Sequence, residues 1–531
     1  MFCFRKRTAT TIDFTRSQVD IVPRRNRNSA RLRSHFIEPT CFSIVDDAKL
    51  FKKKYHSQQT MTTASINDNV FEIRKLNQYL GAFVASLGGF ALGISLGWNS
   101  KASVVLRNYF DATVTEIGLI GGILNGGICI GAISMMFIAG RVPRTKIMFW
   151  TMPVLLLTWI LMISHRGQKV VLFLIGRFIC GICGGVFCVL TPIYVAEIAS
   201  KETRGRLLAF FQLLINCGVM YAFYVAHAIT EVETVWRYSA ICGLACLSIA
   251  PVKLLPESPL YYLSRNDEIN AEKSLRWYRG DTYDVQHEIS ETKRLILATS
   301  SKKFSLKLVR NRRVLRSIAT CFGVILAQHL CGVNMMIFYA LILFDTSGSG
   351  ELTGSEQTLV VGAVQILVSL LAAFLVDVLG RRILLTLSSL LMGLFLILLG
   401  WFFSLRDADP ENDDIYFWMS PTWITLIFAS FNLGLGPISW SLLGDTLPEQ
   451  LKTPVVSVAV AFGWLISLMA TLTFDEMIIS LGGTKVMWLS AAICWLTGLF
   501  CAIVAKDNTG KSLIEIQENF RIESNRELAR T

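Results

Sequence analysis

Residues 170–192 read VVLFLIGRFICGICGGVFCVLTP and contain a single charged side chain. A helix of about 20 mostly apolar residues crosses a hydrocarbon core of roughly 30 Å, so this stretch predicts a membrane span. Similar stretches recur along the chain, and the predicted spans cover residues 79–98, 117–139, 146–164, 170–192, 207–229, 236–255, 314–344, 358–378, 383–404, 421–444, 454–475 and 484–505. The sequence therefore predicts an all-α polytopic membrane protein with twelve transmembrane helices.

The composition supports a membrane protein. Of the 531 residues, 53% are hydrophobic and only 17% are charged, and the charges are confined to loops, one central block and the tails. The net charge of +12 fits the usual excess of Lys and Arg on the cytosolic side of membrane proteins better than nucleic-acid binding. No nucleophile–base pair, phosphate loop or metal-ligand spacing stands out, even among the thirteen cysteines, so we expect neither an enzyme nor a bound cofactor or metal.

The loops divide the chain into five parts. Basic residues between spans 2 and 3, spans 4 and 5, and spans 8 and 9 predict that both termini are cytosolic. We expect a disordered basic cytosolic tail at 1–78, a six-helix bundle at 79–255, a cytosolic helical linker domain at 256–313, a second six-helix bundle at 314–505 and a cytosolic tail at 506–531. Met61 is an alternative start, because nothing before it looks necessary for folding.

The two bundles repeat the same pattern of charges. Glu197 after span 4 is followed seven residues later by Arg204, and Asp445 after span 10 is followed seven residues later by Lys452. A further pair of acidic residues follows spans 6 and 12 at matching positions. This repetition predicts a duplicated six-span unit, that is, parallel halves with a site between them at mid-membrane, as alternating access requires.

Charged residues at the cytosolic ends of the spans form a candidate gate. Acid–base pairs between loops can hold the two halves together on one side, and breaking them opens that side. Topology signalling alone explains the basic residues but not the matched carboxylates. The predicted network comprises Arg141, Arg144, Glu197, Arg204 and Glu257 in the first half, and Asp377, Arg381, Arg382, Asp445 and Lys452 in the second.

Uncharged polar side chains inside the spans form a candidate substrate site. Amides are costly in hydrocarbon unless they find partners, and they offer both the donor and the acceptor that sugar hydroxyls need. Interhelical hydrogen bonding explains any single one, whereas six from both halves favour a polar cavity. These residues are Gln212, Gln328, His329, Asn334, Gln365 and Asn432, with Trp440 and Trp464 as flat faces for a sugar ring.

The spans contain few groups that could carry protons. No Asp or Glu lies well inside a predicted span. Proton-driven carriers need a buried carboxylate that titrates as the site moves, so this pattern favours facilitated diffusion. His329 lies deep in span 7, and we interpret it as a ligand or helix contact rather than a proton relay. Gly434, Gly436 and Pro437 predict a broken helix in span 10, and the glycines of spans 2 and 4 predict close helix contact.

Several short motifs occur in a fixed order along the chain. They are Gly176-Arg177, Pro192 to Glu197 with Arg204-Gly205, Pro256 to Pro259, Gln328 to Asn334, Asp377 to Arg382, Gly436 to Trp440 and Gly510 to Leu513. Residues 79–520 thereby resemble the sugar porter family of the major facilitator superfamily, and most of all its insect-type facilitated trehalose transporters. The resemblance implies two six-helix bundles with a cytosolic helical domain near 257–312, and it implies sugar contacts at Gln212, Gln328, His329, Asn334, Gln365 and Trp440.

The chain departs from this family pattern at several positions. The loop from Gly140 to Lys146 lacks the usual acidic residue. His329 stands where the family has a second glutamine, and Asn432 stands at an acidic position. Gly463 replaces an asparagine of some relatives, and Ser95 stands where proton-coupled members carry aspartate.

We therefore expect a facilitative uniporter that moves a hexose or trehalose across the plasma membrane. The alternatives are a transport-inactive sugar sensor that signals through a tail, a proton-coupled sugar symporter, and a carrier of a non-sugar substrate. The spans offer little countercharge for an ionic substrate, which argues against the last alternative. The expected partners are a small-molecule sugar and the lipid bilayer, with no nucleic acid, and the sequence leaves the oligomeric state open.

Overall fold

The computed structural model describes residues 75–109, 113–164, 170–229, 235–300, 312–338, 353–408 and 418–504, together with Phe344 and Glu515. The predicted tails at 1–78 and 506–531, including Met61 and the motif from Gly510 to Leu513, lie outside these residues, apart from 75–78 and Glu515. The described part of the chain consists of helices and their connections, with no named β-strand.

The first half of the chain forms six spans. They are α2 (Lys75–Tyr109), α3 (Val114–Ile138), α4 (Arg144–Ile163), α5 (Val170–Ile198), α6 (Arg204–Ala228), and a sixth in which α7 (Val235–Ala245) continues as the 3-10 helix η1 (Cys246–Leu254). Pro251 lies in this 3-10 segment. A proline supplies no backbone N–H, so it disfavours continuation of a regular α-helix through this segment.

The second half forms six more spans. They are α12 (Arg312–Leu330) with α13 (Val333–Phe338), α15 (Gly354–Leu379), α16 (Arg381–Ala408), α18 (Met419–Leu433) with α19 (Leu435–Asp445), α20 (Glu449–Leu481) and α21 (Gly483–Val504). Across the described residues, twelve segments are long and apolar enough to cross a membrane, which confirms the predicted spans. The break between α12 and α13 was not predicted; it occurs at Gly332, whose φ of +87° favours glycine.

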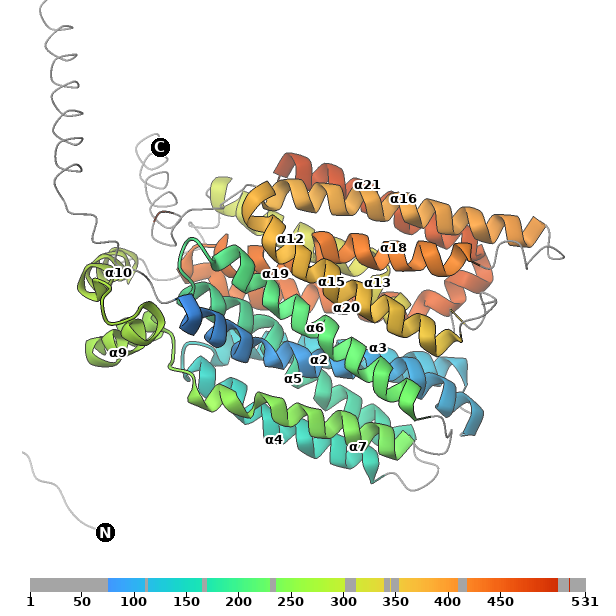
Figure 1. The fold of residues 1–531 in the computed structure, drawn as a ribbon, viewed down its shortest axis with the longest axis horizontal. Coiled ribbons are helices and arrows are strands. Elements are labelled where there is room, and N and C mark those ends of the chain that lie inside the picture. The colour runs from blue at the N-terminus through green and yellow to red at the C-terminus, as the bar shows by residue number, and fades with distance from the viewer. Residues whose placement is uncertain are drawn as a thin grey trace, which may run out of the picture. The chain divides into compact units, whose positions relative to one another are not determined.

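The two halves pack in the same way. In the first half α2 packs on α6 and α3 on α5, and in the second α12 packs on α20 and α15 on α18. The halves meet along α3 with α20 and along α6 with α15 (Figure 1). A Cβ on Gly127 of α3 would lie 2.1 Å from the Phe178 carbonyl oxygen of α5, and one on Gly181 of α5 would lie 2.2 Å from that of Leu124. These helices therefore touch backbone to backbone, as their glycines predict.

The predicted break in span 10 is confirmed at Gly434, between α18 and α19. A Cβ on Gly434 would lie 2.4 Å from the Leu384 carbonyl oxygen of α16, so the helices can meet here only at glycine. Ser388 of α16 satisfies backbone groups near the break: its hydroxyl accepts from the Leu435 N–H at 2.9 Å and donates to the Ser430 carbonyl at 2.7 Å. Such partners are what a broken helix needs inside a membrane.

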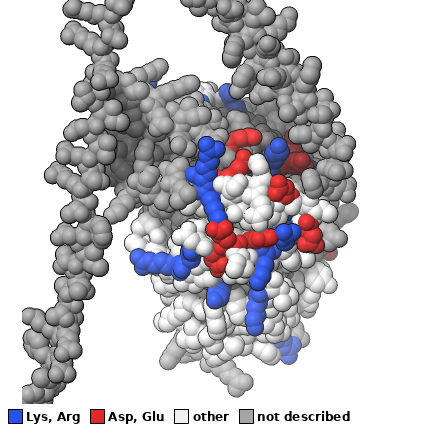
Figure 2. All heavy atoms as spheres, turned by 90° about the vertical axis from the view of Figure 1, so that its left-hand side faces the viewer, with Lys and Arg blue, Asp and Glu red and all other residues white. Residues whose placement is uncertain are grey.

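Among the described residues between the two halves are three linker helices: α8 (Pro259–Leu263), α9 (Glu268–Arg279) and α10 (Val285–Ser300). They have a small core of their own, formed by Leu263, Ala271, Leu275, Val285 and Ile289. In Figure 1, α9 and α10 lie beyond one end of the spans. Figure 2 looks onto this end and shows basic and acidic side chains intermixed rather than a patch of one sign.

Candidate functional site

A polar cavity lies between the two halves, where α2 and α6 face α12, α13, α15, α18 and α20. Its lining residues are Leu96, Gln212, Ile215, Asn216, Gln328, His329, Asn334, Ile337, Gln365, Phe431 and Trp464. The structure thus brings together most of the residues predicted to bind substrate, from both halves. Asn432 and Trp440 do not belong to this lining.

Besides Trp464 Nε1, three buried polar atoms of the cavity wall, all on amide or imidazole side chains, find no hydrogen-bond partner within the described part of the chain. They are Gln328 Oε1, His329 Nε2 and Gln365 Nε2. Their side chains are only 5%, 2% and 1% exposed, and leaving such a group unpaired costs about 1–3 kcal/mol. Free atoms on three side chains around one cavity suit a ligand with several hydroxyl groups, because a hydroxyl both donates and accepts.

A chain of hydrogen bonds joins the halves beside the cavity, and we call its members, Trp440, Gln212, Asn216, Asn432 and Ser369, the amide bridge. Trp440 Nε1 of α19 donates to Gln212 Oε1 of α6 at 2.9 Å. Gln212 Nε2 donates to Asn216 Oδ1 at 3.1 Å. Asn216 Nδ2 then donates across the interface to Asn432 Oδ1 at 2.7 Å and to Ser369 Oγ at 2.6 Å. The chain therefore connects α6 of the first half to α15, α18 and α19 of the second.

The amide bridge occupies the polar atoms of three residues that were predicted to bind substrate, namely Gln212, Asn432 and Trp440. Asn432 Nδ2 donates to the Phe428 carbonyl at 2.9 Å, and the Trp440 ring packs edge-on against Phe211 with centroids 5.0 Å apart. Substrate contact by these three residues stays a prediction, as it does for the other predicted residues. Asn216 was not predicted, although a second amide one helical turn after Gln212 lies on the same helix face and is the signal that points to it.

Each half carries the same ion pair at the same end of its spans. Arg144 at the start of α4 pairs with Glu197 near the end of α5 at 2.8 Å. Arg381 at the start of α16 pairs with Asp445 at the end of α19 at 2.6 Å. All four side chains are less than a tenth exposed. These predicted gate residues each join two spans within one half, in the symmetric arrangement that a duplicated unit produces.

Further interactions cross from one half to the other at this end. Arg206 of α6 forms an ion pair with Asp377 of α15. Arg204, at the first position of α6, interacts electrostatically with Asp445 of α19. Asp377 and Arg204 belong to the predicted gate, whereas Arg206 was missed. Arg206 is one of three basic residues between predicted spans 4 and 5, with Lys201 and Arg204, and the sequence does not show which of them faces the other half.

The hydrogen bonds and ion pairs of the other predicted gate residues join parts of the same half or the adjoining linker helices. Glu257 accepts from both the backbone N–H and the hydroxyl of Thr145 at 2.9 Å. Lys452 pairs with Glu449 within α20 and also interacts electrostatically with Glu197 of the first half. Arg382 donates to the Ala502 carbonyl. The Arg141 side chain is exposed, and its carbonyl accepts from Arg265. Among the described residues, no group of three or more His, Cys, Asp and Glu side chains could hold a metal ion.

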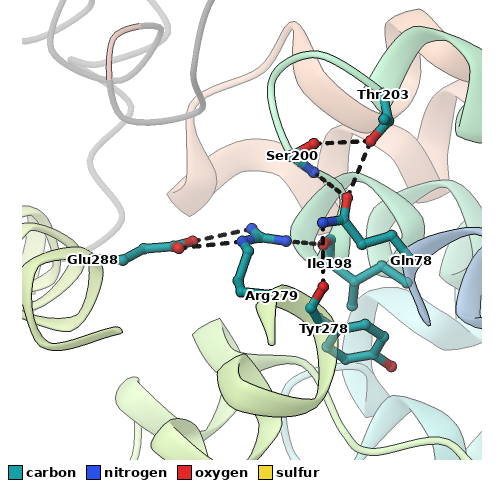
Figure 3. A network of polar contacts seen from close by, with 7 residues as sticks. All are labelled: Gln78, Ile198, Ser200, Thr203, Tyr278, Arg279 and Glu288. Atoms are coloured by element: carbon teal, nitrogen blue, oxygen red, sulfur yellow. Dashed lines mark hydrogen bonds and ion pairs between the residues drawn. The ribbon is translucent and has the colours of Figure 1, made fainter. Parts of the chain in front are cut away.

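The linker helices are fixed to the spans by a polar network that Figure 3 shows in close view. Gln78 of α2 accepts from the Ser200 N–H at 2.9 Å and from the Thr203 hydroxyl at 3.0 Å, in the turn between α5 and α6. Its amide nitrogen donates to the Tyr278 carbonyl of α9 at 3.2 Å. The side chain of Gln78 therefore joins α2 to the turn between α5 and α6 and to the linker helix α9.

Arg279 makes the second connection in Figure 3. It donates to the Ile198 carbonyl at the end of α5 at 2.6 Å, and to both carboxylate oxygens of Glu288 in α10 at 3.2 and 3.0 Å. Burial raises the pKa of the neighbouring Tyr278 hydroxyl, which shares a hydrogen bond with the Tyr194 hydroxyl. The linker helices are thus attached where α5 and α6 meet, next to the buried ion pair of Glu197.

Comparison with known proteins shows the class of this chain. Residues 60–520 match the family model described as "Sugar (and other) transporter". The facilitated trehalose transporter Tret1 of Bombyx mori is 30% identical over 488 residues, covering 90% of this chain and 93% of that protein. The protein of the same name from Apis mellifera ligustica is 29% identical over 498 residues, covering 88% and 95%. The fold is similar to that of the proton:xylose symporter XylE bound to 6-bromo-6-deoxy-D-glucose, with a TM-score of 0.73, 22% identity, and coverage of 84% of this chain and 100% of that chain.

Fold and comparisons together define a polytopic membrane transporter with the major facilitator fold, and not an enzyme. The chain belongs to the sugar transporter family, in which its relatives include insect Tret1 proteins. This confirms the resemblance that the ordered motifs indicated.

Proposed function

We propose that the protein is a facilitative uniporter that moves a hexose or trehalose by alternating access. The unpartnered polar atoms of Gln328, His329 and Gln365 support a substrate rich in hydroxyl groups. The names of the Bombyx and Apis relatives support trehalose as one such substrate. Two similar halves with equivalent ion pairs support a rocking motion around the central cavity.

The surroundings of Arg177, a buried cation in α5, are the main support for passive transport. Its guanidinium donates to the backbone carbonyls of Ser95 and Ile120, and lies 5.3 Å from the centroid of the Trp98 ring. Within the described residues, the groups that interact electrostatically with Arg177 include no carboxylate. Proton coupling needs a carboxylate that titrates during the cycle, and position 95 supplies a serine instead of the aspartate of proton-coupled members.

The proposed orientation places the linker helices and both termini in the cytosol of a cell whose plasma membrane holds the protein. The turns after α3 and α5, which carry several basic residues, lie at the end where the linker helices attach. Arg265 donates to the Gly140 carbonyl at 3.1 Å, and Arg279 donates to the Ile198 carbonyl. Basic turns at one end of the spans support a cytosolic location for that end.

Uptake of radiolabelled glucose and trehalose by proteoliposomes tests the proposal. We expect saturable uptake of at least one sugar, and a KM about 10-fold higher for Gln328→Ala, which removes one hydrogen-bonding side chain from the cavity. Gln286→Ala is the matched control, because this glutamine lies on α10 and bonds to Glu272, far from the cavity. Failure of correctly folded protein to transport either sugar would favour the sensor or a non-sugar substrate.

A further inference from the structure

His329 of α12 and Gly463 of α20 lie against each other in the cavity wall. The imidazole is 2% exposed, and its ring centroid lies 4.6 Å from that of Trp464, with an angle of 58° between the rings. A Cβ on Gly463 would lie 2.5 Å from His329 Cδ2 and 3.0 Å from His329 Nε2. A side chain at position 463 would therefore need the space that the imidazole occupies.

The hydrogen bond to Asn334 assigns the proton on the imidazole ring. Asn334 Nδ2 lies 3.0 Å from His329 Nδ1. An amide nitrogen only donates, so in this orientation of the Asn334 amide Nδ1 accepts, and the proton of the neutral ring sits on Nε2. His329 Nε2 is buried and finds no partner among the described residues. The ring, which lines the cavity, thus holds one N–H donor that has no partner among the described residues.

Building on the proposed transport function, we propose that His329 and Gly463 form a matched pair that determines which sugars the site accepts. The missing side chain at position 463 admits the ring, and the ring directs its Nε2–H at an oxygen of the bound sugar. That oxygen needs only a lone pair, so a hydroxyl, ring or glycosidic oxygen can accept this bond. A sugar without an oxygen at that point leaves the buried donor unpaired and binds more weakly.

The steric fit between His329 and position 463 is tested by thermal stability, which requires no transport. Gly463→Ala is expected to lower the Tm of the purified protein. The same change in the His329→Ala background is expected to lower it less, because the vacated space lets the new methyl group move away from Ile325 Cγ2, which also lies 2.5 Å from the Cβ position. Gly126→Ala is the matched control, since its Cβ would meet Leu468 at an ordinary 3.5 Å. Equal losses of Tm in both backgrounds would overturn the pairing.

The proposed hydrogen bond from His329 to the sugar is tested by uptake of a series of monodeoxy and monofluoro sugars. For wild-type protein, one deoxy position is expected to raise the KM about 10-fold, and fluorine, which accepts but cannot donate, to restore part of the loss. His329→Phe keeps a ring against Gly463 but lacks the donor, so this variant should no longer distinguish the deoxy sugar from its parent. An unchanged deoxy penalty in His329→Phe would refute the specificity role. If wild-type protein transports no sugar, the proposed function and this role both fail, while the Tm measurements still decide the steric pairing.

Discussion

The indole N–H of Trp440 in the second half donates to Gln212 in the first half at 2.9 Å, beside the cavity. Through Gln212 and Asn216 this bond continues to Asn432 and Ser369, so both halves share one buried network. Alternating access requires the halves to separate on one side of the site at a time. In the proposed cycle, the side chains of the amide bridge therefore bond to water or sugar instead of to one another whenever the halves separate at this level of the membrane.

Asn216→Leu is expected to lower stability by about 1–3 kcal/mol, because it leaves the buried amide nitrogen of Gln212 without its acceptor and leaves the oxygen of Asn432 with the bond from Ser369 alone. The shift appears as a lower Tm of the purified protein. Asn270→Ala is the control, because Asn270 is exposed on α9 and its side chain bonds to Asp267. A Tm for Asn216→Leu equal to that of wild type would show that the amide bridge does not hold the halves together.

The two symmetric ion pairs are expected to respond alike to neutralisation. Glu197→Gln and Asp445→Asn each leave a buried arginine without its carboxylate, at a cost of about 3–5 kcal/mol. Thermal denaturation and uptake should both show the loss, with similar size in the two halves. Glu202→Gln serves as the control, since Glu202 is 53% exposed and its pair with Lys75 contributes little. Full stability of either neutralised variant would argue against equivalent roles.

Arg279→Ala is expected to loosen the linker helices from the spans, because it removes the bonds to Ile198 and Glu288 together. Cleavage of the linker by a protease should become about 10-fold faster, reporting a larger population of the opened form. Arg276→Ala is the control, because Arg276 lies on the same helix and its loss removes only an exposed ion pair with Glu272 and a long hydrogen bond to the Asp281 carbonyl. Equal cleavage rates for the two variants would contradict the clamping role of Arg279.

Much of the fold could be predicted because membrane spans follow from apolar length alone. The broken span 10 was also visible, since Gly434, Gly436 and Pro437 concentrate in one turn. The break at Gly332 was not, because a single glycine in an apolar run does not show whether the backbone leaves the helix there.

The site was predictable as a set of residue types but not as a set of partners. Amides in apolar spans indicate a buried polar region, yet whether Trp440 faces a ligand or bonds to Gln212 depends on how α6 and α19 are rotated. Arg206 and Asn216 were missed for the same reason. The fit of His329 against Gly463 joins residues distant in sequence and follows only from the packing of α12 on α20.

The most direct test of facilitative transport is the steady-state sugar concentration inside proteoliposomes, with and without an inwardly directed proton gradient. The account predicts that labelled glucose or trehalose enters until the internal and external concentrations are equal, and that the gradient leaves this level unchanged. Accumulation above the external concentration that collapses when a protonophore is added would contradict the account and establish a proton-coupled symporter.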